Sequence, residues 1–285
     1  GDAAIAEPIE LDTWTAGDLT FRVISPVRNV PDPATATDEK MKEVLCPAVL
    51  AELTLDNSQG EAPRKAFFGF QGNDPYTSMR RLDPVCDLKG IGQGQLLAIA
   101  SNDEFVSSGQ GFNIEAIVAP EHPENLVFGL GGTAALMMDV PPGTALTARF
   151  AICFYRHGTA TANLPTRYLY TQHFEAIEEV AAYALDKFDF YLTEAEQDNA
   201  MIADSKLSDD QKFQLAHAIR SYYGSTELLV DADEQPLWVV NEGEYRMMNT
   251  FDLTVDHLFF EMRLNPWVVR NALDQFVDRY SYRDS

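Results

Sequence analysis

Apolar and polar residues alternate with a period of two through the first half of the chain, which is the pattern of half-buried strands. The alternation is clear over residues 19–23 and 49–55, and turn-forming Gly, Pro, Asn and Asp residues separate one segment from the next. Because no helical period interrupts these segments, we expect an antiparallel β-sandwich. Further strands are predicted at residues 64–70, 95–100, 112–118, 125–130, 134–140 and 144–155.

The second half of the chain changes to a helical period. Small and polar residues at 158–165 separate the two halves, so we expect a domain boundary near residue 160. From about 167 to 204, apolar residues recur every three or four positions, as in an amphipathic helix. Ser208 and Gln211 then fit a capping box, which predicts the start of another helix.

After this helix the pattern predicts a short extended segment and two more helices. The extended segment covers residues 237–240, and a helix is expected to begin at about Thr250. Asn265 and Pro266 are a good pair for an N-cap and a first helical residue, so they should end that helix and start the next. Residues 161–285 are therefore expected to form antiparallel helix pairs, which makes the whole chain an α+β protein of two domains.

The composition narrows the range of partners. The 285 residues include 21 Lys and Arg against 44 Asp and Glu, which gives a formal net charge of −23. Such a chain repels phosphate, so nucleic acid and anionic membrane surfaces are not expected as partners. Cys46, Cys86 and Cys153 are odd in number and lack metal-ligand spacing, which favours a reducing, cytoplasmic location. No apolar run reaches the ~20 residues that a membrane span needs.

No cofactor is expected. The glycine-rich run at 90–94 superficially resembles a phosphate-binding loop, but it precedes a strand and lacks the Lys-Ser/Thr ending. None of the five histidines has ligand spacing with another, so we expect no metal site.

Residues 238–256 hold the strongest candidate for chemistry. Glu242, Glu244, Asp252 and Asp256 lie in this run with apolar residues on both sides. A carboxylate taken out of water costs several kcal/mol unless it is paired or hydrogen-bonded, so such a cluster is a candidate site. The plainer alternative is a loop of solvated charges, and spacing alone favours that alternative.

Glu242 is the first choice within the cluster. Asn241 beside it can donate a hydrogen bond to a substrate hydroxyl, and Gly243 lets a ligand approach the backbone closely. Glu244 can instead pair with a neighbouring cation. We therefore expect Glu242, rather than Glu244, to face a pocket.

Weaker candidates lie elsewhere in the chain. Tyr223 and Glu227 lie four positions apart, where aromatic and polar residues gather at the expected end of a helix. Sugar sites are often lined by such residues. The long polar loop at 71–81 is equally compatible with a surface connection and with a loop that reaches over a neighbouring pocket.

Several of these runs resemble glycoside hydrolase family 52, the β-xylosidases. The resemblance is strongest over residues 239–256, which read Val-Val-Asn-Glu-Gly-Glu-Tyr-Arg-Met-Met-Asn-Thr-Phe-Asp-Leu-Thr-Val-Asp. It covers essentially the whole chain, and a run of this length is far more specific than a short motif. The other runs that carry it are residues 14–21, 74–81, 207–213, 217–224 and 278–282.

The resemblance implies a β-sandwich over residues 1–160 and the first helices of an (α/α)6 barrel over residues 161–285. It also implies a retaining hydrolysis that releases xylose from the non-reducing end of β-1,4-xylooligosaccharides. The nucleophile would be the Glu of the Asn-Glu-Gly triplet, which is Glu242. The family also suggests a homodimer. Asn241 and Tyr223 stay substrate-binding candidates on the residue arguments given above.

A related family implies a sugar-binding role for the residues that follow Glu242. Family 116 glycosidases carry a comparable Asn-Thr-x-Asp run whose Asp holds sugar hydroxyls. In this chain that Asp falls on Asp252, so Asp252 is expected to bind the sugar together with Asn249 or Thr250.

The chain departs from family 52 in its length. Family members are longer at both ends, and their general acid is an Asp that lies later in the helical barrel than this sequence reaches. We therefore expect a fragment that carries the nucleophile without the general acid and is nearly inactive alone. Its binding partner would be the rest of the same polypeptide. Two alternatives stay open: a β-glucosidase on the same scaffold, and a non-catalytic carbohydrate-binding or interaction protein.

Overall fold

A computed structural model describes residues 11–25, 27–82, 87–119, 131–160, 164–243 and 247–281. The chain divides into two compact units, each made of three separate segments. The chain passes from one unit to the other after residues 26, 46, 155, 175 and 207. The single domain boundary near residue 160 stays a prediction. Unit 1 contains Gly1–Pro26, Pro47–Tyr155 and Ala176–Leu207, and unit 2 contains Val27–Cys46, Arg156–Glu175 and Ser208–Ser285.

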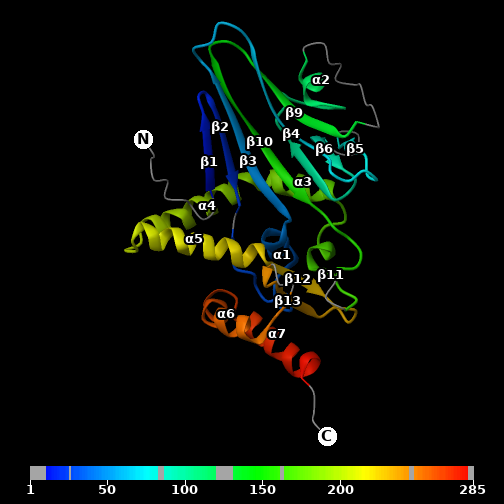
Figure 1. Cartoon of the computed structure of the whole chain (residues 1–285), viewed down its shortest axis with the longest axis vertical. Helices are drawn as coiled ribbons and strands as arrows, with labels where there is room; N and C mark the ends of the chain where they lie inside the picture. The colour runs from blue at the N-terminus through cyan, green and yellow to red at the C-terminus, as the bar shows by residue number, and fades with distance from the viewer. Residues whose placement is uncertain are drawn as a thin grey trace. The chain divides into compact units, whose positions relative to one another are not determined.

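Unit 1 is built on a seven-stranded antiparallel sheet (Figure 1). Its longest strands, β3 and β10, pair from Thr144 opposite Asn57 to Cys153 opposite Ala48. The strands predicted from the alternation at 19–23, 49–55 and 144–155 are confirmed. In the order of the sheet, the strands are β1 (Leu11–Ala16), β2 (Leu19–Ile24), β3 (Ala48–Asn57), β10 (Thr144–Phe154), β7 (Leu97–Ser101), β6 (Lys89–Gln93) and β5 (Met79–Arg81).

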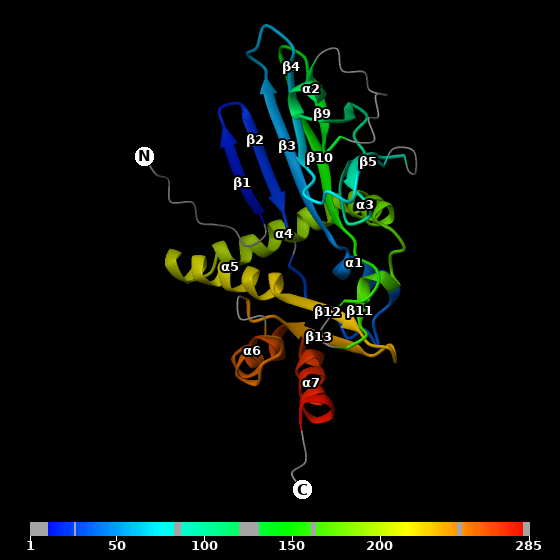
Figure 2. The ribbon, with the colours of Figure 1, turned by 45° about the vertical axis from the view of Figure 1, so that its right-hand side comes forward.

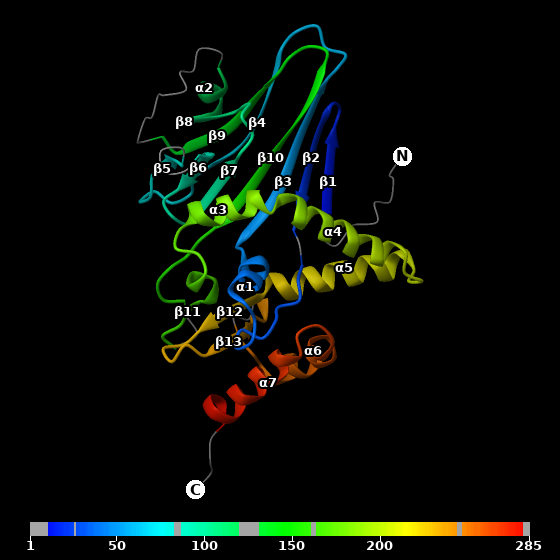
Figure 3. The ribbon, with the colours of Figure 1, turned by 180° about the vertical axis from the view of Figure 1, so that it is seen from behind.

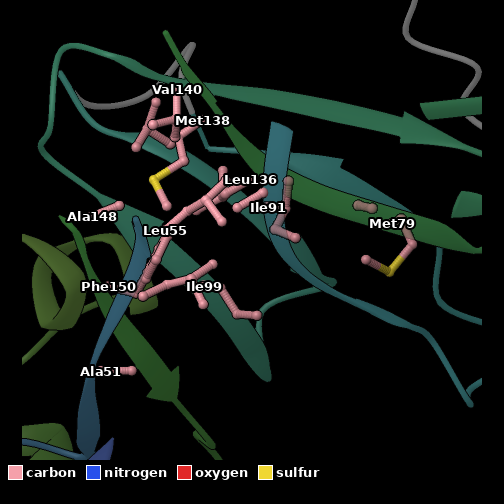
Figure 4. Close-up of a cluster of buried hydrophobic side chains, with 14 residues drawn as sticks. Ala51, Leu55, Met79, Ile91, Ile99, Leu136, Met138, Val140, Ala148 and Phe150 are labelled. Carbon is pink, nitrogen blue, oxygen red and sulfur yellow. The ribbon is translucent and has the colours of Figure 1, made fainter. Parts of the chain in front are cut away.

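A second, three-stranded antiparallel sheet shares a hydrophobic core with the first. Its strands are β4 (Arg64–Gln71), β9 (Thr133–Val140) and β8 (Val106–Gly111), in that order. Side chains from both sheets interdigitate around Phe150 and Leu136, which are 1% and 0% exposed (Figure 4). The strands predicted at 64–70 and 134–140 are thus confirmed as β4 and β9, and antiparallel sheets form the first half of the fold as expected.

The glycine-rich run at 90–94 lies in and just after strand β6. A Cβ at Gly90 would lie 2.8 Å from the Leu82 Cβ, and one at Gly92 would lie 2.9 Å from the Leu97 carbonyl oxygen. These glycines therefore let neighbouring segments of unit 1 approach closely.

The strand predicted at 112–118 is wrong, because helix α2 (Ile114–Val118) forms there. The Asn113 side chain accepts a hydrogen bond from the Ala116 N–H at 2.9 Å and so caps the helix. Ile117 of α2 packs in a cluster with Ala135 and Met137 of β9. The cap therefore overrides the strand propensity of the isoleucines. The strand predicted at 125–130 lies outside the described residues.

Residues 167–204 do not form one continuous helix, which corrects the prediction made from their periodicity. They begin with strand β11 (Arg167–Tyr168) and the 3-10 helix η1 (Leu169–Gln172), and helices α3 (Ile177–Asp186) and α4 (Phe188–Ala203) follow. Helix α3 lies against β3, β7 and β10 (Figure 3). Its apolar face buries Ile177 and Val180, and Glu178 pairs with Arg80 at 2.6 Å. The sheet therefore covers the apolar face of this helix.

Unit 2 contains a small antiparallel sheet that is covered on both faces. Strands β12 (Thr226–Val230) and β13 (Pro236–Val240) form a hairpin, and β11 pairs with β12. Leu229 and Val239 pack on one face of the sheet, and Trp238 and Val240 pack on the other. The predicted extended segment at 237–240 is confirmed as β13.

Four helices complete the described part of unit 2: α1 (Asp38–Leu45), α5 (Asp209–Gly224), α6 (Phe251–Leu264) and α7 (Pro266–Gln275). The predicted capping box is present, because the Ser208 hydroxyl accepts from the Gln211 N–H and the Gln211 side chain accepts from the Ser208 N–H. The predicted helix starts at Thr250 and Asn265 are also confirmed. Helix α7 runs on into a π-helical turn, η3 (Phe276–Tyr280), and lies beside β13 (Figure 2).

Within the described residues, every helix is too short or too polar to cross a bilayer.

Candidate active site

Glu242 follows directly on strand β13. Asn241 continues the pairing of the strand, since its N–H donates to the Ser225 carbonyl at 2.8 Å. The Glu242 N–H in turn donates to the Met247 carbonyl at 2.8 Å. Hydrogen bonds thus fix the backbone on both sides of the Asn241–Glu242 peptide, so the carboxyl group leaves the sheet from a defined point.

Gly243 allows the chain to turn immediately after Glu242. Its φ is +66°, in the left-handed region that favours glycine. The Glu242 side chain is partly buried, whereas Gly243 is exposed. Glu242 is therefore partly shielded and lies beside accessible backbone. Glu244, the alternative carboxylate, lies outside the described residues.

Asn249 faces inward onto β13 and is only 7% exposed. Its side-chain oxygen accepts a hydrogen bond from the Val240 N–H at 2.8 Å, and its side-chain nitrogen donates to the Trp238 carbonyl at 2.9 Å. Its own N–H donates to the Val240 carbonyl at 2.9 Å, and its φ is +48°. These contacts join the segment after Glu242 to the strand before it.

Thr250 and Asp252 lie where helix α6 begins. Thr250 is the N-cap residue, and Asp252 is exposed in the first turn. The Thr250 hydroxyl and then the Leu253 N–H lower the pKa of Asp252 below its usual range. Asp252 is therefore an ionised hydrogen-bond acceptor that the positive end of the helix dipole stabilises. It lies ten positions after Glu242 in the sequence.

Tyr223 lies near the end of α5 and packs against the apolar cluster that contains Trp238 and Val240 of β13. The Asn265 side-chain nitrogen donates to the Tyr223 hydroxyl at 3.2 Å and to Glu261 at 3.0 Å. The Tyr223 ring also packs edge-on against Phe260. The structure thus joins Tyr223 to the junction of α6 and α7, whereas Asn241, Glu242 and Asn249 belong to the segment after β13 that the bridge between Asn241 and Met248 folds back on the strand.

Glu227 lies on β12 and is held by a tyrosine. The Tyr168 hydroxyl donates to the Glu227 carboxylate at 2.8 Å. Burial, with a smaller effect of the Glu227 hydrogen bond, raises the pKa of Tyr168 to about 12. The pair joins β11 to β12, and it lies on the opposite face of the sheet from Trp238 and Val240.

Two residues of helix α7, Asn271 and Gln275, support strand β13, and the sequence did not predict them. The Asn271 side chain binds the backbone of β13, and the Gln275 side-chain nitrogen donates to the Asn271 side-chain oxygen. Both polar residues share the helix face of the buried Val268 and Ala272. Polar side chains at apolar-face spacing are the signal that could have identified them.

No group of three or more His, Cys, Asp or Glu residues in the described ranges is arranged to hold a metal ion.

Comparisons with known proteins identify the family of the chain. The sequence profile of glycosyl hydrolase family 52 matches residues 8–285. A protein named beta-xylosidase from Geobacillus stearothermophilus is 54% identical over 277 residues, which cover 97% of this chain and 39% of that protein. A second beta-xylosidase from the same organism is 52% identical over 280 residues, which cover 96% of this chain and 44% of that protein. The chain thus spans about two fifths of the length of these relatives. Because the family profile extends over nearly every residue, the chain belongs to glycosyl hydrolase family 52.

Proposed function

We propose that this chain is part of a β-xylosidase that releases xylose from the non-reducing end of β-1,4-xylooligosaccharides with retention of configuration. The observation that carries the proposal is the position of Glu242. This carboxylate leaves the end of a hydrogen-bonded strand, half buried, and the residue after it is an exposed glycine with a positive φ. Family membership and the names of the two relatives support the glycosidase class and the xyloside substrate.

The proposed mechanism uses two carboxyl groups. Ionised Glu242 attacks the anomeric carbon and forms a covalent glycosyl-enzyme, while a protonated carboxyl group gives its proton to the leaving oxygen. In retaining enzymes the two groups lie ~5 to 5.5 Å apart, and the second then activates the water that releases the sugar. We propose that this second group is an Asp outside the present sequence.

The residues around Glu242 have separate proposed roles. Asp252, which is ionised and exposed, accepts hydrogen bonds from sugar hydroxyls, with Thr250 beside it. Asn241 donates to the substrate next to the nucleophile. Asn249 and Tyr223 complete the proposed set, and their observed bonds to the protein give them a supporting part in the shape of the site.

The proposal extends to the architecture. The two sheets of unit 1, which share one core, correspond to the β-sandwich of residues 1–160. Helices α5, α6 and α7 correspond to the first helices of an (α/α)6 barrel within residues 161–285. A homodimer in the cytoplasm is part of the same proposal.

Hydrolysis of aryl β-xyloside and aryl β-glucoside, measured side by side, tests the function. The enzyme is a polypeptide of the relatives' length that contains this chain, and the isolated chain is measured in parallel. We expect turnover of the xyloside by the long polypeptide, nearly none by the isolated chain, and a loss of at least about 1,000-fold in Glu242→Ala. Added azide should restore the variant and yield a glycosyl azide of inverted configuration.

The outcomes separate the alternatives. A preference for the glucoside would identify a β-glucosidase on this scaffold, and an absence of turnover by the long polypeptide would favour a non-catalytic carbohydrate-binding protein. Full activity of Glu242→Ala would overturn the assignment of the nucleophile and direct attention to Glu227 and Glu244. A Glu43→Ala variant is the matched control, because that glutamate lies on helix α1 and pairs with Lys40.

A further inference from the structure

The outer edge of β13 carries backbone groups that β12 cannot satisfy. In an antiparallel pair, alternate residues direct their N–H and C=O groups towards the same neighbouring strand. Asn241 bonds towards β12 through Ser225, so Pro236, Trp238 and Val240 direct theirs away from β12. Among the described residues, β13 is the last strand of its sheet on that side, and backbone pairing there begins at the end of the strand, with the isolated bridge between Asn241 and Met248.

Side-chain amides take the place of the missing strand. The Asn271 nitrogen donates to the Pro236 carbonyl at 2.7 Å, and its oxygen accepts from the Trp238 N–H at 2.9 Å. The Asn249 nitrogen donates to the Trp238 carbonyl, and its oxygen accepts from the Val240 N–H. Pro236 has no N–H to satisfy. The two amides thus bind this edge of β13 as far as the residue two positions before Glu242.

Gln275 links the two asparagines. Its side-chain nitrogen donates to the Asn271 oxygen at 2.9 Å, and its oxygen accepts from the Asn249 nitrogen at 3.4 Å. Gln275 is 5% exposed and Asn249 is 7% exposed, so water does not compete freely for these bonds. We call Asn249, Asn271 and Gln275 the amide network. It connects helix α7 to the backbone on both sides of Glu242.

The network does more than satisfy buried polar groups. Amide hydrogen bonds are directional, so they fix the position of β13 along α7 as well as its distance from the helix. Apolar packing of Trp238 against Trp267 fixes the distance only. A nucleophile must lie within a near-attack geometry, and a displacement of 1 Å can lower a rate by about 100-fold. The network therefore holds the backbone that leads to Glu242 in a fixed position relative to α7.

We propose that Gln275, through Asn271 and Asn249, is a positioning residue for the nucleophile Glu242. This proposal rests on the proposed function. Gln275 binds no substrate in this scheme. It holds the two amides at the spacing that keeps β13, and with it the Glu242 carboxylate, in the place required for attack.

The test uses Gln275→Met in a polypeptide of the relatives' length, with an aryl β-xyloside as the substrate. Methionine is unbranched and close to glutamine in length and shape, and it removes both hydrogen bonds. We expect kcat to fall by about 10- to 100-fold while KM changes by less than about threefold, because placement for attack is lost and binding of the sugar is kept. The matched control is Leu185→Ala, which destabilises a buried position of α3 in unit 1. The control should lower the Tm and keep kcat.

A second variant separates positioning from a loss of folding. In Gln275→Glu, the introduced carboxyl group can donate to Asn271 only when it is protonated. The ratio of its kcat to that of the parent should therefore fall as pH rises. A ratio that is constant with pH, or a kcat for Gln275→Met equal to that of the Leu185→Ala control, would overturn the proposal. Azide rescue of Glu242→Ala, measured in the same series, reports on the proposed function independently.

Discussion

At the scale of single residues, Glu261 is the most unusual group in unit 2. It is 4% exposed, and its Oε2 accepts one hydrogen bond, from the Asn265 side chain at 3.0 Å. Its Oε1 has no hydrogen-bond partner among the described residues. Burial raises the pKa of Glu261 to about 7, and the Asn265 hydrogen bond offsets only part of that rise. Burial disfavours the ionised form of this carboxyl group, so the folded state favours the neutral form.

Stability should fall as pH rises through the range in which Glu261 ionises. The carboxyl group has a higher pKa in the folded state than in the unfolded state, so the folded chain binds more protons between about pH 4.5 and 7. Ionisation above pH 7 costs the folded state on the order of 3 kcal/mol. Glu261→Gln should remove this cost, so its free energy of unfolding should exceed that of the parent at pH 8 and approach it at pH 5.

Chemical denaturation at several pH values checks this prediction. The exposed Glu104→Gln is the matched control, because it removes one carboxylate without changing a buried site. A free-energy difference between Glu261→Gln and the parent that stays constant from pH 5 to pH 8 would contradict the assignment.

At the scale of elements, helix α5 shows how a cap specifies a boundary. Its apolar periodicity is weak, and of its side chains only Ala216 and Tyr222 are buried. The reciprocal bonds of Ser208 and Gln211 nevertheless fix its first turn, because they satisfy N–H groups that have no partner within the helix. The start of this helix therefore depends more on its cap than on packing.

Two serine substitutions in α5 should have opposite effects. Ser208→Ala removes the cap and should lower the free energy of unfolding by about 1 kcal/mol. Ser221→Ala changes an exposed position inside the same helix and should raise it by a few tenths of a kcal/mol, because alanine is the better helix former. Thermal unfolding followed by circular dichroism measures both. Equal effects of the two substitutions would show that the capping box does not stabilise the helix.

The same contrast between local and distant causes explains what the sequence could predict. The alternation at β3 and β10, the capping box at Ser208 and the proline at the start of α7 are local signals, so the sequence predicts those elements. The helix at 114–118 was missed because the Asn113 cap outweighed the β-branched residues around it. The periodicity at 167–204 does not reveal that β11 pairs with β12, because this pairing joins residues about 60 positions apart in the sequence.

The candidate site divides in the same way. Glu242, Asn241 and Gly243 are adjacent in the sequence, so their combination could be recognised from one run of residues. Asn271 and Gln275 follow Glu242 by more than 25 residues, and they reach the hairpin only because α7 packs beside β13. No spacing rule connects them, and folding alone brings them together.

At the scale of the whole chain, the net charge of −23 should make stability depend on salt. Carboxylates outnumber cationic side chains by about two to one, so the compact state carries net repulsion between its charges. The Debye length falls from about 30 Å at 0.01 M salt to about 10 Å at 0.1 M, and the repulsion is screened accordingly.

We expect the Tm to rise between 0.01 M and 0.5 M sodium chloride, by about 2–4 °C for each kcal/mol of repulsion that is removed. Differential scanning calorimetry measures the shift. Potassium chloride should give the same rise, because screening depends on ionic strength and not on the identity of the cation. A Tm that is constant or falls with salt would show that attractive ion pairs, such as Arg80 with Glu178, outweigh the general repulsion.

The amide network also bears on how the chain behaves at high concentration. A terminal strand with unpaired N–H and C=O groups is a template on which a second chain can add a strand and begin to aggregate. Along Pro236, Trp238 and Val240 these groups are already occupied by Asn249 and Asn271 of the same molecule. The strand that leads to Glu242 is therefore closed to intermolecular β-sheet growth, although it lies at the border of its sheet.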